Sequence, residues 1–176
     1  VILGDDNGLL DPTGPYVDKN TKLDISTNAS GDAAIVVKGD TLANGTPQIE
    51  SSAVSGTGAV GATAYTSTAG SEQFGFCAEE TLTPSVGPVV LSAPYNDASC
   101  STTTQTADAA GGTGGNGTAA FGFDTANATG TSGSTIATKP AGDTSTITLS
   151  FLGNISDVTE AGIYTTTLTF IATGTF

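Results

Sequence analysis

The chain has 176 residues, a length that suits one domain with a hydrophobic core. It carries 17 acidic residues against four lysines, with no arginine or histidine, and its formal net charge is −13. Such a surface repels phosphate groups, so we expect neither nucleic acid nor an anionic lipid surface as a partner. Without histidine there is no Ser-His-Asp triad and no ordinary zinc site. The composition therefore argues against an enzyme.

The residue types favour strands over helices. Threonine is β-branched and suits a half-exposed sheet, and it is abundant here, together with 24 glycines that can form turns. Good exposed helix formers are scarce. No apolar stretch of about 18 residues is present, so we expect no insertion into a membrane. The first ten residues lack the features of a signal peptide, and if the protein is exported, the sequence begins after the cleavage point.

Residues 1–20 are predicted to form an extended arm, because two prolines and three glycines there exclude a helix. Residues 21–176 are predicted to form a single domain. Alternation in 23–27 and the apolar run 33–38 predict an antiparallel hairpin. Further short strands are expected, in chain order, at 59–64, 73–77, 89–91, 133–138, 144–153 and 163–176.

One segment stands out for its low complexity. Residues 101–119 are rich in glycine and threonine and are expected to form a surface loop inside the domain. Phe121 and Phe123 follow it and should return the chain to the core.

The last two predicted strands carry the clearest pattern. In 144–153 and 163–176, apolar residues alternate with threonine and serine, which predicts one buried and one exposed face. Between them, Glu160–Tyr164 has the acid-x-Gly-x-Tyr form of a tyrosine corner, in which the Tyr164 hydroxyl ties a loop back to the sandwich. The alternative is a core-facing tyrosine after an ordinary turn. About eight to ten short strands predict an all-β fold, a two-sheet β-sandwich of immunoglobulin-like or jelly-roll type.

Two features indicate export to the cell surface. Cys77 and Cys100 lack metal-ligand spacing, so we expect a disulfide, with two buried free thiols as the alternative. Five Asn-x-Ser/Thr sequons are candidates for N-glycosylation, which would make the chain a glycoprotein; the alternative is unmodified surface asparagines. These sequons start at Asn28, Asn44, Asn116, Asn127 and Asn154.

Carboxylates are the remaining source of chemistry. A turn-prone segment between Gly4 and Asp11 collects oxygen ligands of the kind that Ca²⁺ binds, and Ca²⁺ is the one candidate cofactor. The candidate ligands are Asp5, Asp6, Asn7 and Asp11. Glu79 and Glu80 are the best candidate for a glycoside-hydrolase pair, but sugar grooves bring aromatic side chains, which lie here mostly at core-facing positions. We expect a solvated acidic loop there.

Two C-terminal stretches resemble the ends of secreted bacterial β-sandwich proteins, a group that includes WxL-like surface proteins and TasA/camelysin-type fibre subunits. They are TITLSFLGNIS at 146–156 and EAGIYTTTLTF at 160–170, with weaker likeness at 23–28, 36–42 and 71–76. The resemblance implies an extracellular location and a structural part in an envelope or filament. The WxL signature is absent because the chain has no tryptophan, and without histidine no metal ligands of camelysin-type proteins carry over.

The predicted arm suggests how copies associate. Its apolar residues have no hairpin partner in the sequence, so the arm could add as a donor strand to a neighbour's open sheet. These residues are Val1, Ile2, Leu3, Leu9 and Leu10. We therefore expect a structural subunit of an extracellular filament or surface layer, a homopolymer built by strand donation. The alternatives are an adhesive or carbohydrate-binding surface module, which would recognise glycans through loops in 101–132, and a jelly-roll capsid or spike protein.

Overall fold

The structure is a computed structural model and describes most of the chain. The described residues are 1–4, 8–13, 16–49, 65–66, 70–96, 100 and 120–175. The strand predicted at 59–64, the loop predicted at 101–119, Asp5, Asp6, Asn7 and Asn116 lie outside the described residues.

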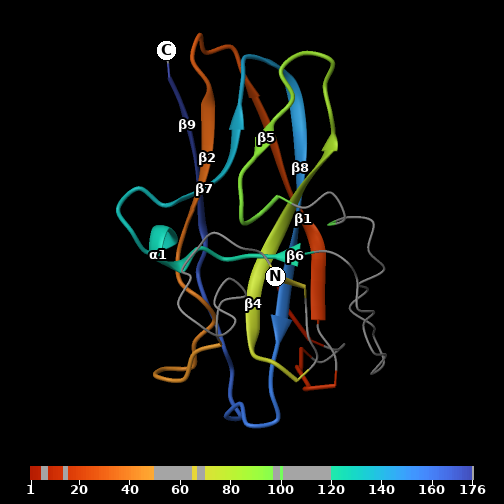
Figure 1. Cartoon of the computed structure of the whole chain (residues 1–176), viewed down its shortest axis with the longest axis vertical. Helices are drawn as coiled ribbons and strands as arrows, with labels where there is room; N and C mark the ends of the chain where they lie inside the picture. The colour runs from red at the N-terminus through yellow and green to blue at the C-terminus, as the bar shows by residue number, and fades with distance from the viewer. Residues whose placement is uncertain are drawn as a thin grey trace.

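Two antiparallel sheets pack against each other, which confirms the predicted all-β sandwich (Figure 1). The first sheet has the order β1 (Tyr16–Thr27), β8 (Gly142–Asn154), β4 (Gln73–Leu82). The second has the order β5 (Val90–Leu91), β7 (Ser134–Lys139), β2 (Ala33–Lys38), β9 (Thr169–Gly174). A short ribbon pairs β3 (Tyr65–Thr66) with β6 (Ala120–Phe121), and one helical turn, α1 (Thr125–Ala128), follows it.

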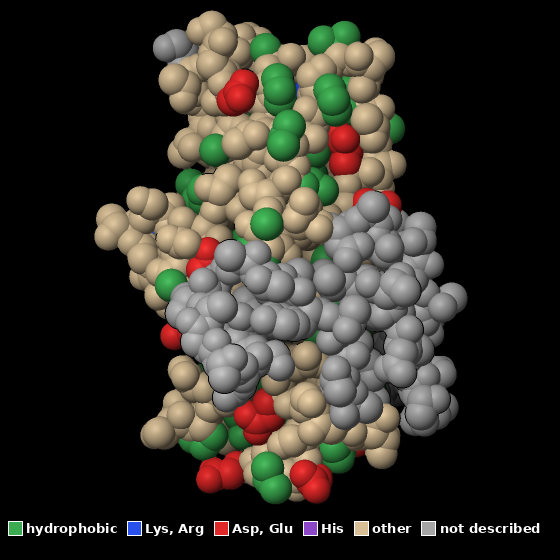
Figure 2. Space-filling model, in the orientation of Figure 1, with side chains coloured by type: hydrophobic (Ala, Val, Ile, Leu, Met, Phe, Trp, Pro, Cys, Tyr) green, Lys and Arg blue, Asp and Glu red, His purple; other side chains and the backbone are tan. Residues whose placement is uncertain are grey.

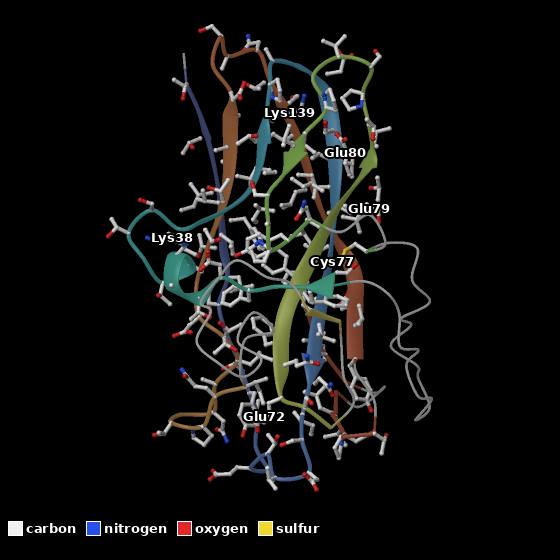
Figure 3. The ribbon with its side chains drawn as sticks, in the orientation of Figure 1. Lys38, Glu72, Cys77, Glu79, Glu80 and Lys139 are labelled. Atoms are coloured by element: carbon white, nitrogen blue, oxygen red, sulfur yellow. A yellow bond between two sulfur atoms is a disulfide. The ribbon has the colours of Figure 1, made fainter. Side chains whose placement is uncertain are left out.

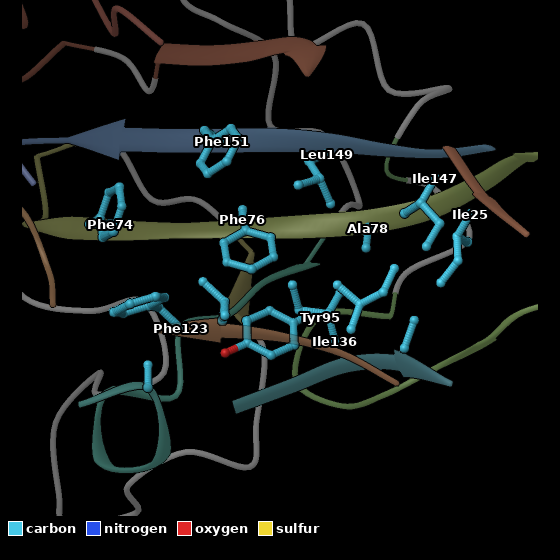
Figure 4. Packing of buried hydrophobic residues seen from close by; sticks show 14 of the residues in the cluster. Ile25, Phe74, Phe76, Ala78, Tyr95, Phe123, Ile136, Ile147, Leu149 and Phe151 are labelled. Atoms are coloured by element: carbon cyan, nitrogen blue, oxygen red, sulfur yellow. The ribbon is translucent and has the colours of Figure 1, made fainter. Parts of the chain in front are cut away.

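The core lies between the two sheets (Figure 4). Phe76 on β4 occupies its centre, because alternate strand residues point to the same face. Its ring stacks on Tyr95 with 4.5 Å between centroids and lies 5.4 Å from the ring of Phe151. Leu149 and Ile136 close the space from β8 and β7. Burying one such side chain contributes about 1.5–3 kcal/mol, so this cluster holds the sheets together.

A second, smaller cluster covers the outer face of the first sheet. The predicted disulfide is formed between Cys77 and Cys100, with 5.9 Å between their Cα atoms. Val17, Leu152 and Phe121 pack around it. As a result, β8 is covered on both faces: the main core lies on one side and this cluster on the other.

The predicted hairpin of 23–27 with 33–38 is wrong. β1 pairs with β8, whereas β2 pairs with β7 and β9, so the two consecutive strands lie in opposite sheets. Alternation requires only that one face of a strand meets the core, and either sheet satisfies that requirement. The turn between them therefore crosses from one sheet to the other.

The arm is shorter than predicted. β1 begins at Tyr16, and the buried side chains of Tyr16 and Val17 fix this start opposite Gly153 and Leu152 of β8. We call residues 1–13, which precede β1, the N-terminal arm. None of its described residues belongs to a strand.

The burial expected for the last two strands is also wrong, in opposite senses. The second half of β8 is buried on both faces, whereas no described residue in 163–175 is fully buried. β8 is central in its sheet and covered on each side, while β9 stands at an edge. Position in the sandwich, rather than the alternating pattern, sets the depth of burial.

Candidate functional site: an apolar groove beside the N-terminal arm

An apolar groove opens between the first sheet and the chain that leads into β9. Its free volume is about 310 Å³. We call it the arm groove. It is lined by Val1 and Leu3 of the arm and by Thr21, Leu42, Phe74, Phe151, Tyr164, Thr165, Thr166, Leu168 and Phe170.

The groove exists because one wall is incompletely covered. Tyr164, Thr166, Leu168 and Phe170 form the even-numbered face of the final strand segment, and this face points into the sandwich. All four side chains stay half-buried, whereas Phe74 and Phe151 on the opposite wall are buried. An apolar face that points inward without being covered leaves room for another apolar segment.

The arm supplies a side chain that fits this groove. Leu3 is half-buried and packs against the main core cluster. It sits over Gly153 of β8, where an added Cβ would lie 2.9 Å from Leu3 Cδ1 and 3.2 Å from Leu3 Cβ. Any larger residue at 153 would therefore fill the space that Leu3 occupies. Of the predicted donor residues, Val1 and Leu3 reach the groove.

Beyond Leu3, the described part of the arm bends back at Gly4 and is exposed at several positions. Gly4 has φ of +135° and lies so close to Gly8 and Leu9 that an added Cβ would come within 2.5 Å of the Gly8 carbonyl carbon. Only glycine adopts this backbone without strain. Ile2 is 80% exposed and Leu9 63% exposed, while Leu10 is half-buried. The arm thus closes on itself and uses only part of its apolar surface.

A carboxylate fixes the base of the arm. Asp11 Oδ1 accepts hydrogen bonds from the backbone N–H of Thr13, at 2.7 Å, and from the Thr13 hydroxyl, and Oδ2 accepts one from the Tyr16 hydroxyl at 2.6 Å. The hydrogen bonds from Thr13 and Tyr16 lower the pKa of Asp11. Both oxygens of this predicted calcium ligand are engaged by protein donors, and the other three candidates lie outside the described residues.

Tyr164 lies at the mouth of the groove. Its hydroxyl donates to the Glu160 carbonyl oxygen at 2.8 Å, four residues upstream, which closes the loop between β8 and β9. Partial burial, together with the negative charges of Glu160 and Glu72, raises the pKa of Tyr164. Glu72 also accepts a hydrogen bond from Thr159 at 2.6 Å, so the residue just before β4 and the β8–β9 loop are joined here.

Two of the sequons are packed in the fold. Asn154 is fully buried on β8, and its Nδ2 lies 3.4 Å from Gln73 Oε1, so a glycan on Asn154 would require this part of β8 to open. The amide of Asn44 packs directly against the backbone of Gly162. A glycan on Asn44 would require that contact to open.

The other described sequons lie at the surface. Asn127 in α1 is exposed, but its Nδ2 donates to Asp124 Oδ2 at 2.6 Å as part of the cap of this helical turn. Asn28, in the turn between β1 and β2, is exposed. Asn28 therefore stays a candidate glycosylation site.

The acidic pair on β4 does not form a catalytic site. Glu79 and Glu80 are consecutive strand residues, so their side chains point to opposite faces of the sheet (Figure 3). Glu80 accepts a hydrogen bond from the Val89 backbone N–H at 3.1 Å and holds the connection to β5. The two carboxylates cannot converge on one glycosidic bond.

Sequence reasoning missed two positions that shape the fold, one at the arm groove and one away from it. Gly153 forms the notch under Leu3, although its place in an alternating strand gave no sign of that role. Lys139 is fully buried, and its ammonium donates to the carbonyl oxygens of Gly87 and Pro140, the latter at 3.3 Å. It ties the β4–β5 connection to β7, which no sequence motif indicates.

No protein-family model, curated protein or solved structure matches this chain. The resemblance to WxL-like and TasA/camelysin-type proteins therefore stays a prediction. In the described part of the chain, no helix is both long and apolar enough to cross a bilayer. Within the same residues, no three Cys, Asp or Glu side chains gather as a metal site.

Proposed function

We propose that this chain is a structural subunit of an extracellular filament or surface layer and that it polymerises by strand donation from its N-terminal arm. One observation carries the proposal. The arm, whose described residues belong to no strand, places the apolar residues Val1 and Leu3 at an apolar groove that they fill only in part. Strand addition uses such pairs, because backbone hydrogen bonds provide affinity and alternate side chains provide specificity.

Other features agree with an exposed polymer. The Cys77–Cys100 disulfide suits an oxidising compartment. Figure 2 shows acidic side chains at several places on one face of the molecule and almost no lysine. A net charge of −13 keeps free copies soluble and apart. Salt screens this repulsion, so we expect polymerisation to accelerate between low ionic strength and about 0.15 M.

Removal of residues 1–10 tests the proposal. The truncated protein should keep the fold, because the described residues among them form no part of either sheet, and it should form no filaments under conditions where the full chain does. Circular dichroism and electron microscopy measure the two properties. The matched control replaces Val158 and Ile163, which are 81% and 82% exposed in the β8–β9 loop, with serine. Filaments from the truncated protein, or equal loss in the control, would contradict strand donation.

A second candidate function is an adhesive or carbohydrate-binding module. It is favoured by a polar hollow next to the arm groove, where the Tyr164 ring meets the Glu72 and Glu160 side chains and the segment at Gln48. Aromatic rings and carboxylates of this kind bind sugar hydroxyls. Binding on a glycan array that is lost in Tyr164→Ala, with discrete monomers in the microscope, would favour this function over the filament.

A further inference from the structure

Resting on the proposed function, we infer that the arm groove receives the N-terminal arm of a second copy, with Leu3 as the anchoring side chain and Gly153 as the notch beneath it. The contact between Leu3 and Gly153 within one chain is then the intramolecular form of the contact that we infer between two copies. Growth of a polymer exchanges the arm of one copy for the arm of the next.

The fit of Leu3 to the groove supports this exchange. Leu3 packs against the core over a position where only glycine leaves room, so the groove has a specific seat for it. An element that binds its own chain can bind an identical site on another copy at little energetic cost. Each copy offers one arm and one groove, and such a head-to-tail contact is open-ended unless it closes into a ring.

The closed arm also leaves binding surface unused. About 310 Å³ of the groove stays unfilled, and the inward face formed by Tyr164, Leu168 and Phe170 is half-exposed. At the bend, Gly4 lies against the backbone of Gly8 and Leu9, and neither of these two residues lines the groove. When extended, ten residues span up to about 33 Å. An extended arm from a neighbour could therefore place further apolar side chains along the groove, which the bent arm cannot do.

Pairwise cross-linking tests the receiving site. A Cβ at 153 would lie 3.2 Å from Leu3 Cβ, close to the separation of about 3.5–4.5 Å in a disulfide. We mix Leu3→Cys protein with Gly153→Cys protein, polymerise and oxidise. We expect a disulfide-linked dimer of the two variants on a non-reducing gel. Ile2→Cys, whose side chain is exposed, replaces Leu3→Cys as the matched control and should give little product.

The outcomes separate this inference from the proposed function. If the mixed variants form filaments but yield no linked dimer, or if Ile2→Cys links as efficiently, the receiving site is wrong while the filament proposal stands. If the wild-type protein forms no filaments in any condition that folds it, the proposed function itself fails. The linked dimer supports both.

Gly4→Ala provides a second measurement that does not depend on a cysteine at 153. The substitution strains the bent arm, since φ of +135° and contact with the Gly8 and Leu9 backbone disfavour any Cβ. Opening the closed arm raises the share of copies that can donate it. We expect assembly at a roughly tenfold lower protein concentration. Unchanged or weaker assembly of a folded Gly4→Ala protein would overturn competition between the closed and exchanged arms.

Discussion

β8 and β9 have similar alternating sequences but opposite environments. β8 lies between β1 and β4, with the main core on one face and the Cys77–Cys100 cluster on the other. β9 pairs only with β2 among the described strands, and the segment before it borders the arm groove. The comparison teaches that alternation specifies which residues face inward, while neighbouring elements decide whether those residues are covered. The inward apolar face that is left uncovered is the place where we propose that a second copy binds.

The same substitution in the two regions gives the largest expected difference. Leu149→Ala on β8 removes a fully buried side chain and should lower the free energy of unfolding by about 3 kcal/mol. Leu168→Ala beside the groove removes a half-buried one and should lower it by less than about 1 kcal/mol. Chemical denaturation of the monomer measures both. Equal losses would show that the groove wall is as well packed as the core.

For filament formation we expect the opposite ranking, with Leu168→Ala more harmful than Leu149→Ala. Leu168 lines the groove that we propose receives an arm, so Leu168→Ala should impair assembly even though the monomer stays folded. Leu149→Ala is the control, studied at temperatures where its monomer is folded, because Leu149 faces the core and is not part of the groove lining. Normal filaments from Leu168→Ala would contradict a role for this wall in assembly.

Removal of the disulfide tests how much the cluster on the outer face of β8 contributes to the free energy of unfolding. Replacing Cys77 and Cys100 with alanine opens a link between residues 23 apart in sequence and should lower the free energy of unfolding by about 3 kcal/mol. The arm groove lies elsewhere in the fold, so the substituted protein should still assemble at temperatures where it is folded. Loss of assembly without loss of the fold would show that the disulfide cluster on the outer face of the first sheet affects the arm groove.

The hydrogen bonds that Asp11 accepts from Thr13 and Tyr16, which we call the Asp11 clasp, should make the base of the arm sensitive to acid. Its pKa in the folded chain lies below its ordinary value of 3.8, so the clasp contributes stability above about pH 4 and loses it as pH falls through the lowered folded pKa. NMR titration of the Asp11 carboxyl carbon measures this pKa. Asp11→Asn should release residues 1–13 to protease at neutral pH. A carboxyl group that titrates at its ordinary value would show that the clasp is not formed.

The smallest expected effect concerns a hydroxyl on β8. Ser145 is fully buried, and its Oγ has no hydrogen-bond partner among the described residues. Ser145→Ala should therefore leave the free energy of unfolding unchanged or raise it by up to about 1 kcal/mol. Ser150→Ala is the matched control on the same strand, because its hydroxyl donates to the Cys100 carbonyl oxygen at 3.4 Å, and it should destabilise. A loss in Ser145→Ala equal to the control would reveal a missed partner.

The residue pattern was sufficient to predict the fold class and much of the core. Period-two apolar residues placed Phe74 and Phe76 on one face of β4, because side-chain direction in a strand follows from local backbone geometry. Phe121 and Phe123 are buried as expected, although they belong to different clusters. The cysteine pair was likewise readable, since its spacing fits no metal site.

Strand pairing and the apolar faces that stay uncovered depend on the arrangement of distant elements in space. β1 and β2 read as a hairpin yet lie in opposite sheets, and the strong pattern of 163–175 ended at the least buried edge. The notch at Gly153 and the seat of Leu3 arise from segments at opposite ends of the chain. Such contacts depend on how distant elements share space, a property that no local pattern of residues encodes.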